Sequence, residues 1–177
     1  MSKTSQEHKS LAPIHLNFAV FMCSTSRYSE MKQGKKVEDP SGDLIVKYLE
    51  GAGHKTVLKK IISDSRVMIQ QNVQMALDSE NVNAIITCGG TGISPRDVTI
   101  ESVKPLFEKE LDGFGEIFRR LSFDEIGSAA VLSRATAGLS RGKVVFCIPG
   151  SPQAVSLCFE RLILPEVSHI LKHATEE

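Results

Sequence analysis

The amino-acid sequence predicts an α/β fold with a mostly parallel central sheet and one antiparallel strand. In the first half of the chain, three apolar runs of strand type alternate with helical patterns, and this order is typical of a parallel sheet with right-handed crossovers. In the second half, two further runs lie on either side of a turn, which predicts a hairpin and one antiparallel strand. The predicted strands are residues 16–23, 56–62, 84–88, 135–138 and 143–148.

The helices of the first half are predicted from capping residues and from apolar residues at helical spacing. The polar segment 24–40 is expected to be a loop, and Ser41 is expected to cap a helix that ends near Gly51. Residues 63–65 are expected to start a second helix, which carries apolar residues between positions 67 and 77. The charged residues within 56–62 place that strand nearer an edge of the sheet.

The second half is predicted to contain four helices. Thr99 is expected to cap a short helix that Pro105 interrupts, and two helices, the last at 165–173, are expected to close the chain. Between these lies a helix with one apolar stripe made of Phe114, Ile117, Phe118 and Leu121. Phe123 lies off that stripe, and an extra exposed aromatic residue of this kind indicates a partner surface.

Length and composition limit the possible functions. The 177 residues fit one domain, predicted at 14–177 after a flexible polar tail at 1–13. The 21 basic and 21 acidic residues balance, so nothing indicates a nucleic-acid partner. No apolar stretch is long enough to span a bilayer or to form a signal core, which favours a cytoplasmic protein without a membrane partner.

Neither the cysteines nor the histidines are assigned a binding role. The four cysteines lack C-x-x-C spacing, which favours reduced, buried thiols. Because Cys23, Cys88 and Cys147 end apolar runs, a metal site built from them is the alternative. The five histidines are not expected to bind anything.

The most informative stretch is residues 87–99, whose sequence is T-C-G-G-T-G-I-S-P-R-D-V-T. Three glycines within four residues follow the end of a strand, so the backbone can turn tightly and approach a ligand closely. Amides without intervening side chains form a concavity that suits phosphate. Arg96 adds a positive charge, and Asp97 adds a carboxylate able to hold a divalent cation. The stretch therefore predicts a phosphate and a metal in one loop.

Two common nucleotide-binding motifs do not fit this loop. A P-loop requires Gly-Lys-Ser/Thr after its glycines, whereas this chain has Gly92-Ile93-Ser94. A dinucleotide fingerprint started at Gly90 would place Pro95 at its third glycine position. The remaining alternative is a strand-to-helix turn without a ligand, but such a turn does not need the Arg-Asp-x-Thr residues that follow.

Ligands of open α/β sheets bind beyond the carboxyl ends of the strands. Four segments lie at such ends: 24–27, 63–64, 89–99 and 149–152. In the last segment Ser151 is at a cap position and Pro152 at the first helical position, which leaves backbone amides for an anion. An ordinary helix cap is the alternative for Ser151, and also for Asp64.

The sequence resembles a known family at these motifs. The run Gly-Gly-Thr-Gly-x-x-x-Arg-Asp-x-Thr at 89–99, the Pro-Gly-Ser-Pro turn at 149–152 and the segment 113–116 are similar to those of the molybdopterin-binding proteins of molybdenum cofactor synthesis, the MoaB/Mog group. The resemblance extends from about residue 16 to residue 172, and 39–42 matches the family's Asp-x-Ser-Gly. The first loop departs from the family's Ser-Asp pattern, because Thr25 follows Ser24.

The resemblance implies a fold, an activity and an assembly. The fold would be a three-layer α/β sandwich, and the assembly a homo-oligomer, either a trimer or a hexamer. Catalytic members of the family are adenylyltransferases, which join the AMP part of ATP to molybdopterin with Mg²⁺ and release pyrophosphate. The partners implied for this chain are therefore molybdopterin, ATP and further copies of itself.

The resemblance also implies site residues. The family's catalytic aspartates correspond to Asp64 and Asp97, which we interpret as Mg²⁺ ligands because the attacking phosphate is already anionic and needs no general base. Arg96 is expected to pair with Asp97. The residues implied in substrate binding are Ser24, Gly89, Gly90, Thr91, Gly92, Ser122, Pro149, Gly150 and Ser151.

Three functional hypotheses follow. The first is a molybdopterin adenylyltransferase, a nucleotidyltransferase of molybdenum cofactor biosynthesis. The second is a non-catalytic molybdopterin-binding or assembly module of the same pathway, and the third is a related domain that hydrolyses nucleotides. The presence of both Asp64 and Asp97 favours the enzyme over the binding module.

Overall fold

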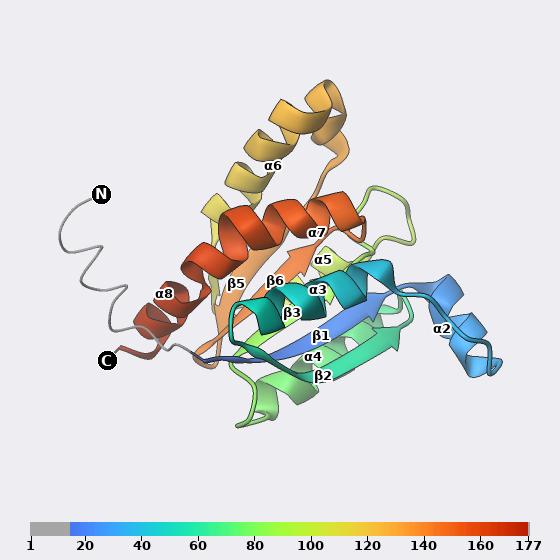
Figure 1. The fold of residues 1–177 in the computed structure, drawn as a ribbon, viewed down its shortest axis with the longest axis horizontal. Coiled ribbons are helices and arrows are strands. Elements are labelled where there is room, and N and C mark those ends of the chain that lie inside the picture. Colours follow the sequence, from blue (N-terminus) through green and yellow to red (C-terminus); the bar gives the residue numbers. More distant parts are fainter. Residues whose placement is uncertain (1–14, 177) are drawn as a thin grey trace.

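The computed structural model describes residues 15–176, so the tail predicted at 1–13 lies outside the described residues (Figure 1). Its centre is a six-stranded sheet in the order β2-β1-β3-β6-β5-β4. Four strands are parallel, β5 is antiparallel to β6, and β4 is antiparallel to β5, so β5 alone runs against the others. The strands are β1 (Asn17–Cys23), β2 (Lys55–Ile62), β3 (Ala84–Cys88), β4 (Lys109–Glu110), β5 (Thr136–Ser140) and β6 (Lys143–Ile148). The predicted α/β class with one antiparallel strand is confirmed.

The position of each strand explains its composition. β3 is buried along its whole length and β6 is buried after its first residue, because helices cover both faces of the sheet. β2 lies at an edge of the sheet, and exposed residues alternate with partly buried ones along most of it, which agrees with its charged residues. β4 was not predicted, since it consists of two exposed charged residues that carry no apolar signal.

Helices cover the two faces of the sheet and form the outer layers of a three-layer sandwich. One face packs against α3, α6, α7 and α8, and the other against α4 and α5. Figure 1 shows α3 and α7 in front of the sheet and α4 behind it. The α-helices are α2 (Thr25–Lys32), α3 (Pro40–Gly51), α4 (Arg66–Asp78), α5 (Thr99–Val103), α6 (Asp112–Ile126), α7 (Pro152–Cys158) and α8 (Leu164–Thr175).

Two predictions about the first half of the chain are wrong. The segment 24–40 is not all loop, because it contains α2, which buries no residue and so has no apolar stripe to reveal it. Ser41 does not cap α3. The cap is Asp39, whose Oδ1 accepts a hydrogen bond from the Gly42 amide at 3.0 Å, with Pro40 at the first helical position.

The second half of the chain confirms the predicted hairpin. Its turn has two residues, Arg141 and Gly142, with φ of 52° and 69°, which is the left-handed pair that a tight hairpin requires. The helices predicted after the hairpin form one continuous run, because a π-helical segment, η3 (Phe159–Ile163), joins α7 to α8. Within residues 15–176, no helix combines the length and apolar character needed to cross a membrane.

Candidate active site

The carboxyl ends of β2, β1, β3 and β6 meet at one edge of the sheet. Main-chain hydrogen bonds link the loops that leave these ends: the Ser24 amide donates to the carbonyl of Ile62 at 2.9 Å, and the Gly89 amide donates to that of Ile148 at 3.0 Å. All four predicted loop segments therefore begin side by side, at the edge where open α/β sheets bind ligands.

Gly89 is the point of closest backbone packing at this edge. Its φ is +99°, and a Cβ built on it would lie 2.5 Å from the carbonyl oxygen of Cys23. A Cβ on Gly150 would lie 3.2 Å from the Cα of Gly89. Two loops and the end of β1 thus meet through backbone alone, which requires glycine.

Thr99 closes the glycine loop. Its Oγ1 donates to the carbonyl of Gly89 at 2.8 Å, and its amide donates to the carbonyl of Gly90 at 2.9 Å. The expectation that Thr99 caps α5 is wrong, because Val98 holds the cap position and Thr99 is the first helical residue. The buried hydroxyl instead holds the two ends of the loop together.

Asp64 lies beside the glycine loop and is not a helix cap. Its Oδ2 accepts hydrogen bonds from the amide and the hydroxyl of Thr25, at 2.9 and 3.1 Å, while Ser65 holds the cap position of α4. Among the described residues 15–176, its Oδ1 is buried without a hydrogen-bond partner. That oxygen lies 2.8 Å from the position that a Cβ on Gly90 would take. The side chain thus directs an unsatisfied carboxylate oxygen at the loop.

Asp97 lies at the other side of the same loop. Its Oδ2 accepts from the Ser94 amide at 2.9 Å and lies 2.8 Å from the position of a Cβ on Gly92. The expected pairing of Asp97 with Arg96 is not seen, because no ion pair joins these two described residues. Gly90 and Gly92 therefore each face an aspartate carboxylate, across the space their missing side chains leave.

A cavity of about 300 Å³ opens over the glycine loop. Its lining combines predicted residues with three that sequence reasoning missed, Leu132, Ser133 and Arg134. Arg134 also forms an ion pair with Glu101. The antiparallel direction of β5 was the signal that could have found them, because it brings the residues before Thr136 to the edge where the parallel strands end. The lining residues are Gly89, Gly90, Thr91, Gly92, Asp97, Leu132, Ser133, Arg134, Pro149 and Gly150.

Asp64 and the three predicted serines are not among the residues that line this cavity. Ser151 caps α7, and its Oγ accepts from the Ala154 amide at 3.3 Å. Ser24 caps α2 in the same way. Ser122 is buried within α6, where its Oγ donates to the carbonyl of Phe118 at 2.8 Å.

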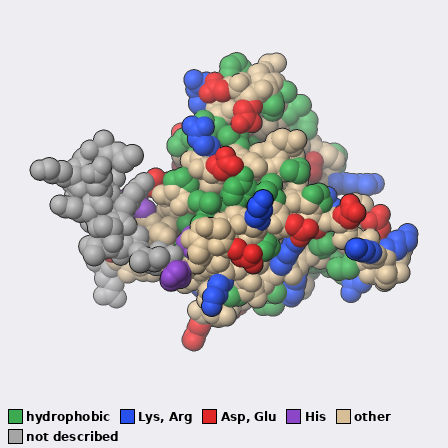
Figure 2. Space-filling view, in the orientation of Figure 1, with side chains coloured by type: hydrophobic (Ala, Val, Ile, Leu, Met, Phe, Trp, Pro, Cys, Tyr) green, Lys and Arg blue, Asp and Glu red, His purple; other side chains and the backbone are tan. Residues whose placement is uncertain are grey.

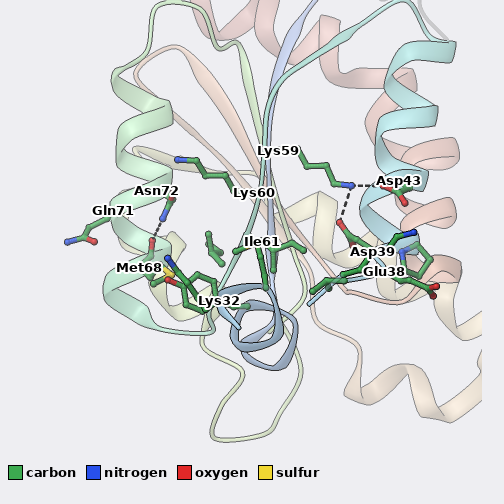
Figure 3. A pocket seen from close by; sticks show the side chains of 16 residues that line it. Lys32, Glu38, Asp39, Asp43, Lys59, Lys60, Ile61, Met68, Gln71 and Asn72 are labelled. Carbon is green, nitrogen blue, oxygen red and sulfur yellow. Dashed lines mark hydrogen bonds and ion pairs between the residues drawn. The ribbon is translucent and has the colours of Figure 1, made fainter. Parts of the chain in front are cut away.

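A larger cavity, of about 960 Å³, lies beside β2 and does not include the glycine loop (Figure 3). The buried carboxylate of Asp39 borders it and forms ion pairs with Lys59 at 3.1 Å and Arg27 at 3.5 Å. Ser41, which follows Asp39 by two residues, contacts the active-site edge of the sheet: its Oγ donates to the carbonyl of Gly150 at 2.7 Å. The Asp-x-Ser-Gly motif thus joins α3 to the turn after β6.

The four cysteines are buried and form no disulfide bond with one another, as predicted. Burial raises the pKa of Cys23 to about 12 and that of Cys147 to about 12, and it also raises the pKa of Cys88 and Cys158. Thiols rather than thiolates are therefore present at neutral pH. No cluster of three or more metal-ligating side chains occurs among residues 15–176.

Raised thiol pKa values predict that the folded protein resists thiol reagents. At pH 8, a thiol with a pKa of about 12 is ionised in roughly one molecule in 10⁴, and only the thiolate attacks. Ellman's reagent should therefore titrate almost no thiol in the native protein, and all four after unfolding in guanidinium. Rapid reaction of a native thiol would contradict the described burial.

Comparisons with known proteins agree with this geometry. A family profile described as "Probable molybdopterin binding domain" matches residues 19–169. Molybdenum cofactor biosynthesis protein B of Bacillus subtilis is 44% identical over 173 residues, which cover 97% of this chain and 98% of that protein. Molybdopterin adenylyltransferase of Pyrococcus furiosus is 45% identical over 175 residues, with 97% and 98% covered.

A solved structure extends the likeness from sequence to fold. The crystal structure of tungsten cofactor synthesizing protein MoaB from Pyrococcus furiosus matches with a TM-score of 0.82 at 44% identity, over 93% of this chain and 100% of that one. The family profile covers the glycine loop, both aspartates and the turn after β6, which are the elements that meet at the carboxyl edge of the sheet. The chain therefore belongs to the molybdopterin-binding family of molybdenum cofactor biosynthesis proteins.

Proposed function

We propose that this protein is a molybdopterin adenylyltransferase, which transfers AMP from Mg-ATP to molybdopterin in the cytoplasm. In this reaction a phosphate oxygen of molybdopterin bonds to the α-phosphorus of ATP, the bond from that phosphorus to the bridging oxygen breaks, and pyrophosphate leaves. The observation that supports the proposal is the buried Oδ1 of Asp64, which has no hydrogen-bond partner among residues 15–176 and lies beside Gly90 of the glycine loop. The name of the Pyrococcus furiosus relative agrees with it.

The residues at the glycine loop suit a magnesium-bound nucleotide. Asp64 and Asp97 supply carboxylate oxygens at Gly90 and Gly92, and Mg²⁺ prefers one or two carboxylates together with substrate phosphates. When bound, Mg²⁺ would neutralise charge on the phosphates during transfer. The residues of the glycine loop and Arg134, whose guanidinium forms an ion pair with Glu101, line the same cavity and can contribute to orienting anionic groups.

No side chain is required as a general base, because the attacking phosphate is an anion at neutral pH. The protein has to align two phosphates, exclude water and balance their charge. Thr99 holds the glycine loop through its hydrogen bond to the carbonyl of Gly89, and Gly89 packs closely against the backbone of Cys23. These contacts fix the backbone amides of the loop in position before the substrate binds. A non-catalytic binding module would need this cradle but not the unsatisfied carboxylate oxygen.

One assay separates the three hypotheses. Purified protein is mixed with Mg-ATP, with and without molybdopterin, and pyrophosphate and adenylyl-molybdopterin are both quantified. We expect equal amounts of the two products, formed only when molybdopterin is present. Binding of molybdopterin without pyrophosphate release would favour the binding module, and consumption of ATP without molybdopterin would favour nucleotide hydrolysis.

We also propose that the protein forms a symmetric homo-oligomer, a trimer or a hexamer, through α6 and the segment that follows it. Phe123 is 54% exposed, as predicted, and Val131 is 79% exposed. Ile126 and Leu132 are also exposed, and Figure 2 shows hydrophobic side chains on the part of the molecule that projects from the sandwich, where α6 lies. This apolar patch does not depend on Ile117, which is 51% exposed although it was predicted on the buried stripe. A patch of this kind marks a surface for association, and one copy of the chain can bury it against another.

Phe123→Glu should therefore shift the oligomer toward monomers, because a charge at the centre of an apolar interface is left without compensation. Light scattering of the untreated protein and the variant at micromolar concentration measures the change in mass. Val67→Glu is the matched control, since Val67 is 62% exposed but lies on α4, away from the patch. A monomeric mass for the unsubstituted protein would contradict the proposal.

A further inference from the structure

His169 and His173 form a pair on the exposed side of α8. They are four residues apart, so both side chains lie on one face of the helix. Their Nε2 atoms approach to 3.0 Å, and the side chains are 23% and 49% exposed. The expectation that no histidine has a binding role overlooks this H-x-x-x-H spacing.

A carboxylate contacts the other ring nitrogen of each histidine. Nδ1 of His169 lies 3.2 Å from Oε2 of Glu166, and Nδ1 of His173 lies 2.9 Å from Oε2 of Glu176. When each Nδ1–H donates to its carboxylate, each neutral ring presents the lone pair of Nε2 to the other. In that tautomer the two lone pairs face each other across 3.0 Å and can both bind one metal ion, whereas in another tautomer one Nε2–H donates to the other ring.

We propose that His169 and His173 bind one divalent transition-metal ion through their Nε2 atoms, with Glu166 and Glu176 orienting the rings. A histidine that ligates a metal almost always donates its other ring N–H to a carboxylate, carbonyl or water, and both rings here have that contact. Imidazole nitrogen suits nickel, copper and zinc, whereas Mg²⁺ prefers oxygen. This site therefore selects a different class of metal from the one proposed at Asp64 and Asp97.

The distance between the nitrogens favours particular metals. With metal–nitrogen bonds of about 2.1 Å, two nitrogens 3.0 Å apart subtend an angle of about 90° at the metal. That is the angle between neighbouring ligands in square-planar or octahedral geometry, which Ni²⁺ and Cu²⁺ adopt, and it is too small for tetrahedral Zn²⁺. Among residues 15–176, no group of three or more histidine, cysteine, aspartate and glutamate side chains is arranged to hold a metal ion, so the proposed site has two protein ligands within the described part of the chain.

The metal site is remote from the glycine loop. The carboxyl end of α8 contacts the turn at the start of β6, because a Cβ on Gly142 would lie 3.7 Å from Cγ2 of Thr175. The glycine loop packs against the opposite end of β6 (Figure 1). Metal at His169 and His173 would bridge successive turns of α8, which predicts a more stable helix end rather than a direct part in catalysis.

The test is titration of untagged, full-length protein with Ni²⁺ alone, followed by calorimetry. We expect one ion per chain, and about 100-fold weaker binding in both His169→Ala and His173→Ala, because the second nitrogen binds intramolecularly. Glu176→Gln should weaken binding about tenfold. His15→Ala is the control, since His15 is an exposed histidine that contacts Gly53 and should not alter binding.

Electron paramagnetic resonance of bound Cu²⁺ gives an independent readout. Coupling to two nitrogens is expected in the unsubstituted protein and to one nitrogen in each single variant. Circular dichroism shows whether the variants keep their fold. Unchanged affinity in the double variant would overturn the proposal and place the metal elsewhere. Absence of binding below millimolar Ni²⁺ would also overturn it, leaving a hydrogen bond between the rings.

Discussion

Asp64→Asn is expected to slow AMP transfer by about 10³-fold, which corresponds to about 4 kcal/mol of transition-state stabilisation. The variant loses the negative charge but keeps an oxygen that can accept from the Thr25 amide, as Oδ2 does at 2.9 Å. The melting temperature without ligand should therefore hardly change. The rate of pyrophosphate release gives the change in turnover, and thermal unfolding of the same preparation gives the change in melting temperature.

A purely structural role for Asp64 predicts the opposite pattern. If the carboxylate only joins the loop after β1 to the loop after β2 through its hydrogen bonds with Thr25, its replacement should lower the free energy of unfolding by about 1–3 kcal/mol. Turnover should then stay near normal. Thr25→Val is the matched control, because it removes the hydroxyl contact to Asp64 and keeps the carboxylate. A destabilised but active Asp64→Asn would remove this residue from the site.

Gly89→Ala should destabilise the fold by about 2–5 kcal/mol. A positive φ costs about 1–2 kcal/mol for alanine, and overpacking adds about 1–3 kcal/mol. Overpacking is expected because the new Cβ would lie 2.5 Å from the carbonyl oxygen of Cys23, a backbone atom that cannot rotate away. In a chain of this size the loss corresponds to a fall of about 10 °C in melting temperature, read by calorimetry.

Gly34→Ala separates the two causes. Gly34 also has a positive φ, +74°, but nothing lies within 4 Å of a Cβ built on it. Gly34→Ala should therefore lower the free energy of unfolding only by the conformational cost of the positive φ, about 1–2 kcal/mol. Equal melting temperatures for the two variants would mean that the close backbone packing between β1 and the glycine loop is not present.

The sheet was predictable from sequence because its central strands carry strong local signals. β3 and β6 are buried on both faces, so they appear as apolar runs that end in Gly or Pro-Gly turns. The hairpin was also predicted, but its turn was expected at residues 139–142, whereas β5 continues to Ser140 and only Arg141 and Gly142 form the turn. α2 was missed because all its residues contact solvent to some degree, and an apolar stripe is the signal by which a helix is found.

The candidate site was predictable where its residues are adjacent in sequence. The glycine loop and Asp97 form one motif, and the structure keeps them in one cavity. Contacts between distant residues were not accessible in the same way. Ser41 donates a hydrogen bond to the carbonyl of Gly150, which is 109 residues away in the sequence, and Asp64 accepts one from Thr25, which is 39 residues away. The sequence alone therefore predicts a helix cap at Ser41 and does not identify Thr25 as the partner of Asp64.

Asp64 and Asp97 are proposed to act together on one Mg²⁺-bound nucleotide, and a double-mutant cycle on turnover tests this proposal most directly. Adenylyl-molybdopterin formation is measured for the unsubstituted protein, Asp64→Asn, Asp97→Asn and the double variant at saturating Mg-ATP. Because ligands of one ion act as a unit, we expect the double variant to be scarcely slower than either single variant. Losses that multiply in the double variant, or a single variant with normal turnover, would contradict it.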